Sequence, residues 1–155
     1  MIPTSSFGEK KASSTYSSKH RLEFAFDGNL DNYWSTTKND ASKSLSISFK
    51  TRIQLSELYV VFAYVPSEMK IFGYENEECT EGEKILKNLT FVLKKSMISI
   101  DNDQFHRCLL FKFVKERNYV GIYEMDLYGS GKGTTDKRFQ NSKALLNLLV
   151  ANCTL

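Results

Sequence analysis

Hydrophobic and polar residues alternate along several short segments of the chain. In Ser44–Phe49, small polar residues separate three apolar ones, which places the apolar side chains on one face of a half-buried strand. The next segment, residues 53–65, is β-branched and aromatic at its centre and ends before Pro66, which predicts a long strand or a strand with a bulge. Further strands are predicted at residues 69–76, 88–95, 96–101, 106–114 and 119–131, with a Glu-rich loop at residues 75–83 and a turn at Lys94–Ser96.

The spacing of these strands predicts the fold class. Polar turns separate the strands, and no amphipathic helix lies between them, so an antiparallel sandwich or barrel is expected rather than a parallel sheet. The last residues differ, because RFQNSKALLNLLVANCTL gathers leucines after a polar start and predicts a short C-terminal helix. Three interpretations of this segment stay open: a helix packed back on the sandwich, a partner-binding or membrane-proximal segment, or a disordered or vector-encoded tail. We therefore divide the chain into a domain at residues 1–131 and a linker with its tail at residues 132–155.

Composition narrows the classes of function. The 155 residues are 41% hydrophobic and 25% charged, as in ordinary globular proteins, and the net charge of +3 comes from basic residues scattered along the chain. No nucleic-acid partner is expected, because such a surface gathers Lys and Arg on one face. No apolar run approaches the roughly 20 residues of a membrane span. The polar and acidic loops at residues 36–43 and 75–83 count against docking on a membrane surface.

The cysteines leave the redox compartment open. Cys79, Cys108 and Cys153 are an odd set without C-x-x-C spacing, which argues against a zinc site. One bridge, for example between Cys79 and Cys108, is compatible with this set. Free thiols in a reducing compartment are the alternative.

The segment AFDGNLDNYWST, residues 25–36, places the single tryptophan, Trp34, close to an Asp-Gly bend. Gly28 can take a positive φ without steric cost, and the side chain of Asp27 can bond to backbone groups two residues along. Two interpretations stay open. The first is an Asx turn beside a buried Trp34. The second is a loop whose oxygens hold a hard cation such as Ca²⁺, with Asp27, Asp31 and Asn32 as candidate ligands.

Four segments, taken in order, resemble the discoidin domain, also known as the type C domain of coagulation factors V and VIII, within the galactose-binding-like superfamily. They are AFDGNLDNYWST, SLSISFKTRIQLSELYVV, VPSEMKIFGYENEE and finally CLLFKFV followed by GIYEMDLYGSG. The resemblance covers residues 10–131. Its most specific elements are the spacing Ala-x-Asp-Gly-Asn-x-x-x-x-Trp and the closing Glu-x-x-x-x-Gly, in which Glu124 and Gly129 stand.

The resemblance implies an all-β fold, an eight-stranded antiparallel jelly-roll β-sandwich with adjacent N- and C-terminal strands. It implies that Trp34 packs under the Asp-Gly loop, which gives the indole N–H a partner; a ligand-stacking role for Trp34 is the alternative. Gly28 and Gly129 are expected to be structural.

The resemblance also implies a structural Ca²⁺ at this loop. Carried over by position, its ligands would be Asp27, Asn29 and Glu124, and Asn32 stands where relatives carry a threonine. An asparagine can still present an oxygen to the ion, so we include Asn32 in the predicted set.

No motif indicates catalysis. His20 and His106 have no neighbouring Ser or Cys arranged as a nucleophile pair, and the sequence contains no G-x-S-x-G, H-E-x-x-H or P-loop motif. The segment GSGKGTT lacks the P-loop spacing and is interpreted as the exit from the domain. We therefore do not expect an enzyme.

The resemblance implies recognition through loops at one end of the sandwich, of sugars, phospholipid surfaces or proteins. A sugar site would place a His or Arg beside an exposed aromatic ring, and His20 and Arg21 stand close to Tyr16 in the sequence. We therefore predict these three residues as ligand-binding. An ordinary exposed loop position is the alternative for His20.

These observations predict a non-catalytic recognition module that binds a glycan or a protein partner, and no oligomeric state follows from them. A cell-surface or extracellular location is favoured because most discoidin domains are extracellular. The alternative is an intracellular, cytoplasmic or ciliary assembly subunit, similar to the small calcium-binding subunit of the intraflagellar transport machinery or to the Doc subunit of the anaphase-promoting ubiquitin ligase. The chain lacks the cysteine pair that brackets coagulation-type domains, which supports that alternative.

Overall fold

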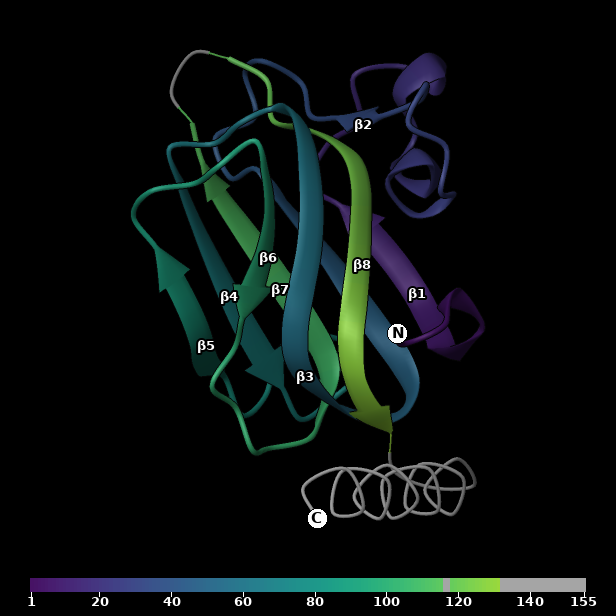
Figure 1. Ribbon diagram of the computed structural model, residues 1–155, viewed down its shortest axis with the longest axis vertical. Coiled ribbons are helices and arrows are strands. Elements are labelled where there is room, and N and C mark those ends of the chain that lie inside the picture. Colours follow the sequence, from purple (N-terminus) through teal and green to yellow (C-terminus); the bar gives the residue numbers. More distant parts are fainter. Residues whose placement is uncertain (116–117, 132–155) are drawn as a thin grey trace, which may run out of the picture.

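The computed structural model describes residues 1–115 and 118–131, which form eight strands and three short 3-10 helices (Figure 1). The predicted C-terminal helix, the tail at residues 132–155 and Cys153 lie outside the described residues. The strands are β1 (Phe7–Ala12), β2 (Trp34–Ser35), β3 (Ser44–Tyr64), β4 (Glu68–Tyr74), β5 (Lys84–Leu89), β6 (Lys95–Ser99), β7 (His106–Val114) and β8 (Gly121–Gly131). The 3-10 helices are η1 (Thr4–Ser6), η2 (Ser18–His20) and η3 (Leu22–Phe26). No helix in the described residues is long and apolar enough to cross a membrane.

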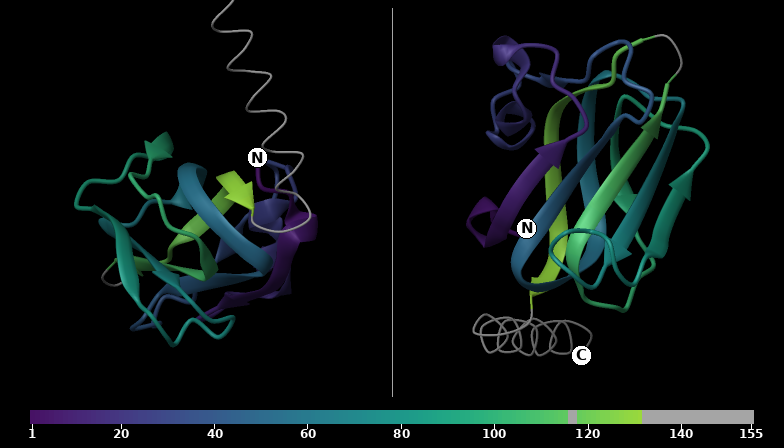
Figure 2. Two further views of the ribbon diagram at one scale, coloured as in Figure 1. Left: turned by 90° about the horizontal axis from the view of Figure 1, so that it is seen from below. Right: turned by 180° about the vertical axis from the view of Figure 1, so that it is seen from behind.

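The strands form two antiparallel layers that share β3. One layer has the order β1-β3-β7-β4-β5, and the other has the order β2-β8-β3-β6. The two layers can be followed in the view from below and the view from behind (Figure 2). This arrangement confirms the predicted all-β, antiparallel fold. The N- and C-terminal strands both flank β3 instead of pairing with each other, although the N–H of Ile2 donates to the carbonyl of Leu127 at 2.7 Å.

The 21-residue strand β3 differs from its prediction as two separate strands. Its first part pairs with β1 and β7, and its second part pairs with β6 and β8. Ile53 marks the corner, since it lies opposite His106 in β7 and Gly131 in β8. The polar residues 50–52, which the sequence indicates as a break, are therefore the place where one strand passes between the layers.

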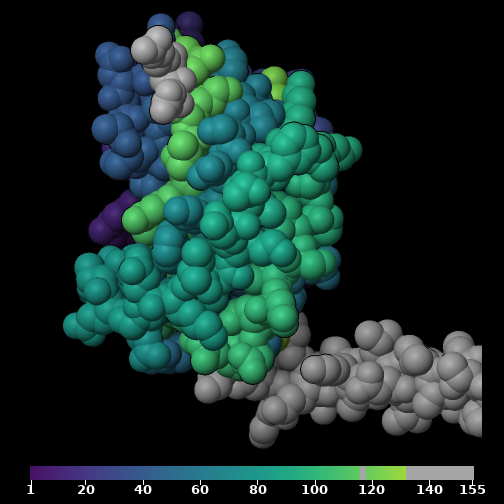
Figure 3. Space-filling view, turned by 90° about the vertical axis from the view of Figure 1, so that its left-hand side faces the viewer, coloured from purple at the N-terminus to yellow at the C-terminus, as the bar shows by residue number. Residues whose placement is uncertain are grey.

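The connection from β5 to β6 corrects a second prediction. The chain turns at residues 90–94, not at Lys94–Ser96, because Lys95 and Ser96 already pair with β3. Phe91 is 76% exposed and Leu93 is 54% exposed, while Val92 packs against the core. Their alternation resembles that of a strand, although no strand among the described residues pairs with Phe91 or Leu93. In the space-filling view the segment from β4 to β6 covers much of the face shown (Figure 3).

The core lies between the two layers. Its largest fully buried side chains include Trp34, Phe49, Phe62 and Phe111. Trp34 belongs to β2 and is 0% exposed. The resemblance implies that the Asp-Gly loop supplies a partner for the indole N–H. Instead, the indole N–H donates to the carbonyl of Ser14 at 3.3 Å, in the segment before η2.

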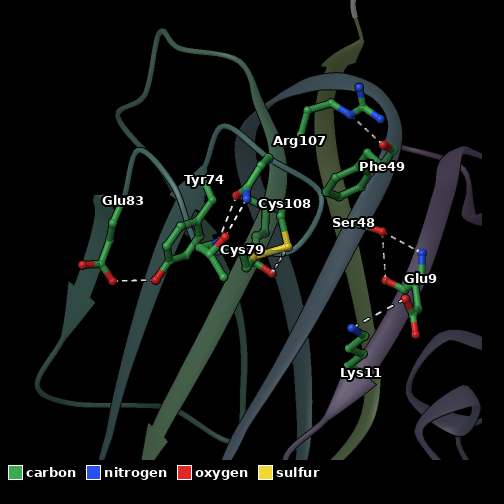
Figure 4. Close-up of a disulfide and its surroundings, with 12 residues drawn as sticks. Glu9, Lys11, Ser48, Phe49, Tyr74, Cys79, Glu83, Arg107 and Cys108 are labelled. Atoms are coloured by element: carbon green, nitrogen blue, oxygen red, sulfur yellow. Dashed lines mark hydrogen bonds and ion pairs between the residues drawn. A yellow bond between two sulfur atoms is a disulfide. The ribbon is translucent and has the colours of Figure 1, made fainter.

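A disulfide joins Cys79 to Cys108, 29 positions apart in the sequence (Figure 4). Cys108 lies in β7, and Cys79 lies in the Glu-rich loop between β4 and β5. Next to the bridge, the guanidinium of Arg107 forms an ion pair with Glu77 of the same loop. The bridge and the ion pair hold the acidic loop against β7, and the structure thus selects the bridged alternative for these two cysteines.

Candidate functional site

Five aromatic rings form a closed cycle at the end of the sandwich where β3 finishes and β8 begins. In order around the cycle they belong to Tyr16, His20, Tyr33, Tyr64 and Tyr119. Successive ring centroids lie 5.8, 4.3, 5.9, 5.8 and 5.2 Å apart, and the last of these distances closes the cycle. These five residues and Ser35 line a pocket of about 220 Å³, which we call the tyrosine pocket.

Four separate segments bring these rings together. Tyr16 and His20 come from the turn that contains η2, and the N–H of Tyr16 donates to the carbonyl of Ser35 in β2 at 2.8 Å. Tyr33 directly precedes β2, Tyr64 is the last residue of β3, and Tyr119 stands just before β8. Each ring is therefore attached at or near the end of a regular element, where the scaffold fixes its position.

The rings also support one another. His20 stacks on Tyr33 with an interplanar angle of 31°, and its Nδ1 lies 3.3 Å from the carbonyl oxygen of Tyr33. Tyr33 makes edge-to-face contacts with Tyr64 and Tyr123. Burial and then the hydrogen bond with Tyr64 raise the pKa of Tyr33 to about 12, so its hydroxyl stays protonated at neutral pH and can donate a hydrogen bond.

The chemistry of the tyrosine pocket is aromatic and hydroxylic. Of the described residues that line it, none is Asp, Glu, Lys or Arg. The tyrosines, His20 and Ser35 offer hydroxyl groups and ring nitrogens next to apolar ring faces. Such a lining suits a small ligand that has both an apolar face and hydroxyl groups.

The structure places two of the three residues predicted to bind ligand in the tyrosine pocket. Tyr16 and His20 both line the tyrosine pocket. Arg21 does not, and its guanidinium carbon lies 5.0 Å from the ring centroid of Phe24. Sequence reasoning missed Tyr33, Ser35, Tyr64 and Tyr119. The only sequence signal was that Tyr64 and Tyr119 stand at the ends of predicted strands, and nothing in the sequence pointed to Tyr33 or Ser35.

The Asp-Gly loop folds as an Asx turn. The Oδ1 of Asp27 accepts the N–H of Asn29 at 2.9 Å, and the Oδ1 of Asn29 accepts the N–H of Asp31 at 3.0 Å. Gly28 has a φ of 70°, which is the left-handed conformation expected for it. The N–H of Gly28 donates to the Oε2 of Glu124 at 2.9 Å, so β8 is tied directly to the bend.

The predicted calcium ligands come together only in part. Asp27 and Glu124 line one pocket of about 300 Å³, with Asp126 beside them, whereas Asn29 and Asn32 do not line it. Burial and the hydrogen bond with Asp126 raise the pKa of Glu124 to about 7. Nowhere in the described part of the chain do three or more His, Cys, Asp or Glu side chains form a group that could hold a metal ion. The calcium ion stays a prediction.

Comparison with known proteins places the fold. No protein-family model and no curated protein matches the sequence. The structure is similar to family 32 carbohydrate-binding modules, which have a discoidin-like, galactose-binding-like β-sandwich. The chain therefore has the discoidin-like fold that the sequence predicts.

Three solved structures illustrate the similarity. Chitosan-binding module 1 of a chitosanase/glucanase from Paenibacillus sp. IK-5 matches with a TM-score of 0.69 and 14% identity over 78% of this chain and 94% of that one. Chitosan-binding module 2 of the same enzyme, in complex with chitotriose, matches with a TM-score of 0.69 and 14% identity over 78% and 95%. The family 32 module of Clostridium perfringens NanJ, in complex with galactose, matches with a TM-score of 0.67 and 17% identity over 81% and 96%.

Proposed function

We propose that the chain is a non-catalytic carbohydrate-binding module and that the tyrosine pocket receives one sugar ring. The closed cycle of five aromatic rings is the observation that carries this proposal. Structures of the same fold hold galactose in one case and chitotriose in another, which supports a sugar as the ligand.

The physical properties of the pocket agree with such a ligand. A pyranose ring presents C–H groups that pack on aromatic faces and hydroxyl groups that exchange hydrogen bonds with Tyr, Ser and His. The volume of about 220 Å³ is smaller than the roughly 300–1,000 Å³ of pockets for drug-sized ligands, so it suits a single monosaccharide unit.

The disulfide supports an extracellular or cell-surface location for this function. Disulfides form and persist in oxidising environments and are rare in the cytosol. The bridge between Cys79 and Cys108 thus favours the extracellular prediction over the intracellular assembly subunit.

A glycan array followed by isothermal titration with the glycans that bind tests the proposal. Galactose and chitotriose are included as defined probes. Tyr16→Ala removes a ring that lines the pocket and is 53% exposed, so the fold should tolerate the change. We expect this variant to weaken binding about tenfold, as for an aromatic residue at the centre of a binding site.

Phe91→Ala is the matched control, because Phe91 is 76% exposed and lies outside the tyrosine pocket. It should bind like the unchanged protein. Absence of binding to every glycan on the array, or equal losses in both variants, would contradict the proposed function.

A further inference from the structure

A second pocket, of about 500 Å³, lies between the β2–β3 loop and the end of β7. We call it the lysine pocket. Its lining includes Lys38, Lys43, Lys115, Asp40, Phe113 and Val114. Three lysines and one carboxylate share this space, so the described lining carries an excess of positive charge at neutral pH.

Lys43 is the most unusual of the three lysines, because only 5% of its surface is exposed. Its Nζ donates to the carbonyl of Asp40 at 2.6 Å and to the carbonyl of Lys38 at 3.5 Å. No ion pair to a carboxylate is found for Lys43 within residues 1–115 and 118–131. Lys43 interacts with the carboxylate of Asp40 through charge but forms no direct ion pair with it. An anion that entered the pocket would therefore add favourable interactions with this buried ammonium.

The single carboxylate of the lysine pocket is already engaged by other groups. Asp40 accepts hydrogen bonds from the hydroxyls of Ser13 and Ser14 and from the N–H of Ser42. Burial alone would raise the pKa of Asp40, but these hydrogen bonds and the charge of Lys43 outweigh it and lower the pKa. The carboxylate of Asp40 thus feels the charge of Lys43, but its hydrogen bonds go to Ser13, Ser14 and Ser42 and it forms no direct ion pair with a described lysine.

The other two lysines keep donors for a ligand. The Nζ of Lys115 donates to the carbonyl of Val65 at 2.6 Å, which leaves further N–H groups of this ammonium. Lys38 is exposed and makes no ion pair with any described residue. The apolar Phe113 and Val114 complete the lining. The pocket therefore suits an anionic group attached to an apolar or neutral body.

Some of the residues that line the lysine pocket stand close in the sequence to residues that line the tyrosine pocket. Ser14 donates to Asp40 at 2.5 Å and stands two residues before Tyr16 of the tyrosine pocket. Lys115 and Tyr119 stand at the two ends of the β7–β8 loop. Figure 1 shows the end of β7, the start of β8 and the β2–β3 loop at the same end of the sandwich. A ligand longer than one sugar unit could extend from one pocket into the other.

We propose that the lysine pocket is a second subsite, which binds an anionic substituent, a sulfate ester or a carboxylate, of the same glycan whose sugar ring enters the tyrosine pocket. This inference rests on the proposed function and narrows its ligand to acidic glycans. The tyrosine pocket supplies ring contacts but no cation, and the lysine pocket supplies the cations.

The test uses a glycan array printed in matched pairs, with and without sulfate or uronic acid, and isothermal titration of the pairs that bind. The acidic member should bind at least about fivefold more tightly than its neutral partner. Lys38→Gln should remove most of this difference, and raising the salt concentration should reduce it. Lys50→Gln, at an exposed position of β3 outside both pockets, should retain it.

The outcomes separate this inference from the proposed function. Equal affinity for neutral and acidic members, with binding lost in Tyr16→Ala, overturns the acidic subsite and leaves the sugar pocket standing. A preference for acidic members that Lys38→Gln and Lys115→Gln both retain also overturns the subsite. If no glycan binds, the proposed function and the acidic subsite are both overturned.

Discussion

The imidazole of His20 stacks on the ring of Tyr33, with centroids 4.3 Å apart, and closes one side of the tyrosine pocket. His20→Ala would open the cycle and remove a polar ring, so we expect glycan affinity to fall about tenfold with little change in the melting temperature. His20→Phe keeps a ring and should retain part of the affinity. Isothermal titration and thermal melting of both variants check this.

Lys19→Ala is the control for this prediction, since Lys19 precedes His20 on η2, is exposed and does not line the pocket. It should bind like the unchanged protein. A similar loss in Lys19→Ala would mean that the turn as a whole, and not the imidazole, determines binding.

Much of the fold follows from the local alternation of apolar and polar residues, as the first part of β3 shows. The alternation in Ser44–Phe49 predicts that Leu45 and Ile47 point inward, and both are fully buried. The same logic failed at Phe91 and Leu93, because alternation reports a strand only where a partner strand is present. The position of the turn between β5 and β6 depends on the pairing of β6 with β3, which lies far away in the sequence.

The candidate site was less predictable than the fold. Tyr16 and His20 stand close together in the sequence, so their proximity could be inferred. Tyr64 and Tyr119 are 55 positions apart and meet only because β3 ends where β8 begins. The register that brings the two rings together is set by long-range strand pairing. A local pattern in the sequence cannot predict that register.

The disulfide gives a stability prediction. A bridge that closes a loop of 29 positions should contribute about 3–4 kcal/mol, mainly by restricting the unfolded chain. Cys79→Ser should lower the free energy of unfolding by that amount in urea titrations, and Cys153→Ser should not. Intact-mass measurement before and after reduction gives an independent check, because an unbridged protein would show no gain of two hydrogens.

The calcium prediction can be tested through stability. An ion that binds only the folded state raises the melting temperature, so the resemblance predicts a higher value in calcium than in chelator. Asp27→Ala should abolish that difference. Identical melting curves in calcium and chelator for the unchanged protein would contradict the prediction.

Two glycines should differ in their tolerance of alanine. A Cβ at Gly129 would lie 1.8 Å from the carbonyl oxygen of Gln54, so Gly129→Ala must push β8 away from β3 and should cost roughly 3 kcal/mol. A Cβ at Gly28 would meet nothing within 4 Å, and only its positive φ opposes the change, at a cost of roughly 1 kcal/mol. Urea unfolding of both variants measures the two costs. Equal losses would contradict the packing argument.

His106 in β7 should make stability depend on pH. Its side chain is buried, and its Nδ1 has no hydrogen-bond partner among the described residues. Burial lowers the pKa of His106 below its ordinary 6.5, the charges of Lys84 and Arg52 lower it further, and Glu75 opposes them. The unfolded chain therefore binds a proton near pH 6.5 that the folded protein does not. Stability should fall as the pH drops below about 6.5, by up to about 1.4 kcal/mol per pH unit from this group.

His106→Phe isolates this contribution from that of other titrating groups. Glu124, whose pKa is raised to about 7, acts with the opposite sign, since its folded form takes up a proton before the unfolded chain does. The quantity to measure is thus the difference in unfolding free energy between the unchanged protein and His106→Phe, at several pH values from 8 to 5. We expect this difference to be constant above pH 7 and to shift in favour of the variant below pH 6.5. A difference that does not change with pH would show that the imidazole is protonated equally in the folded and unfolded states.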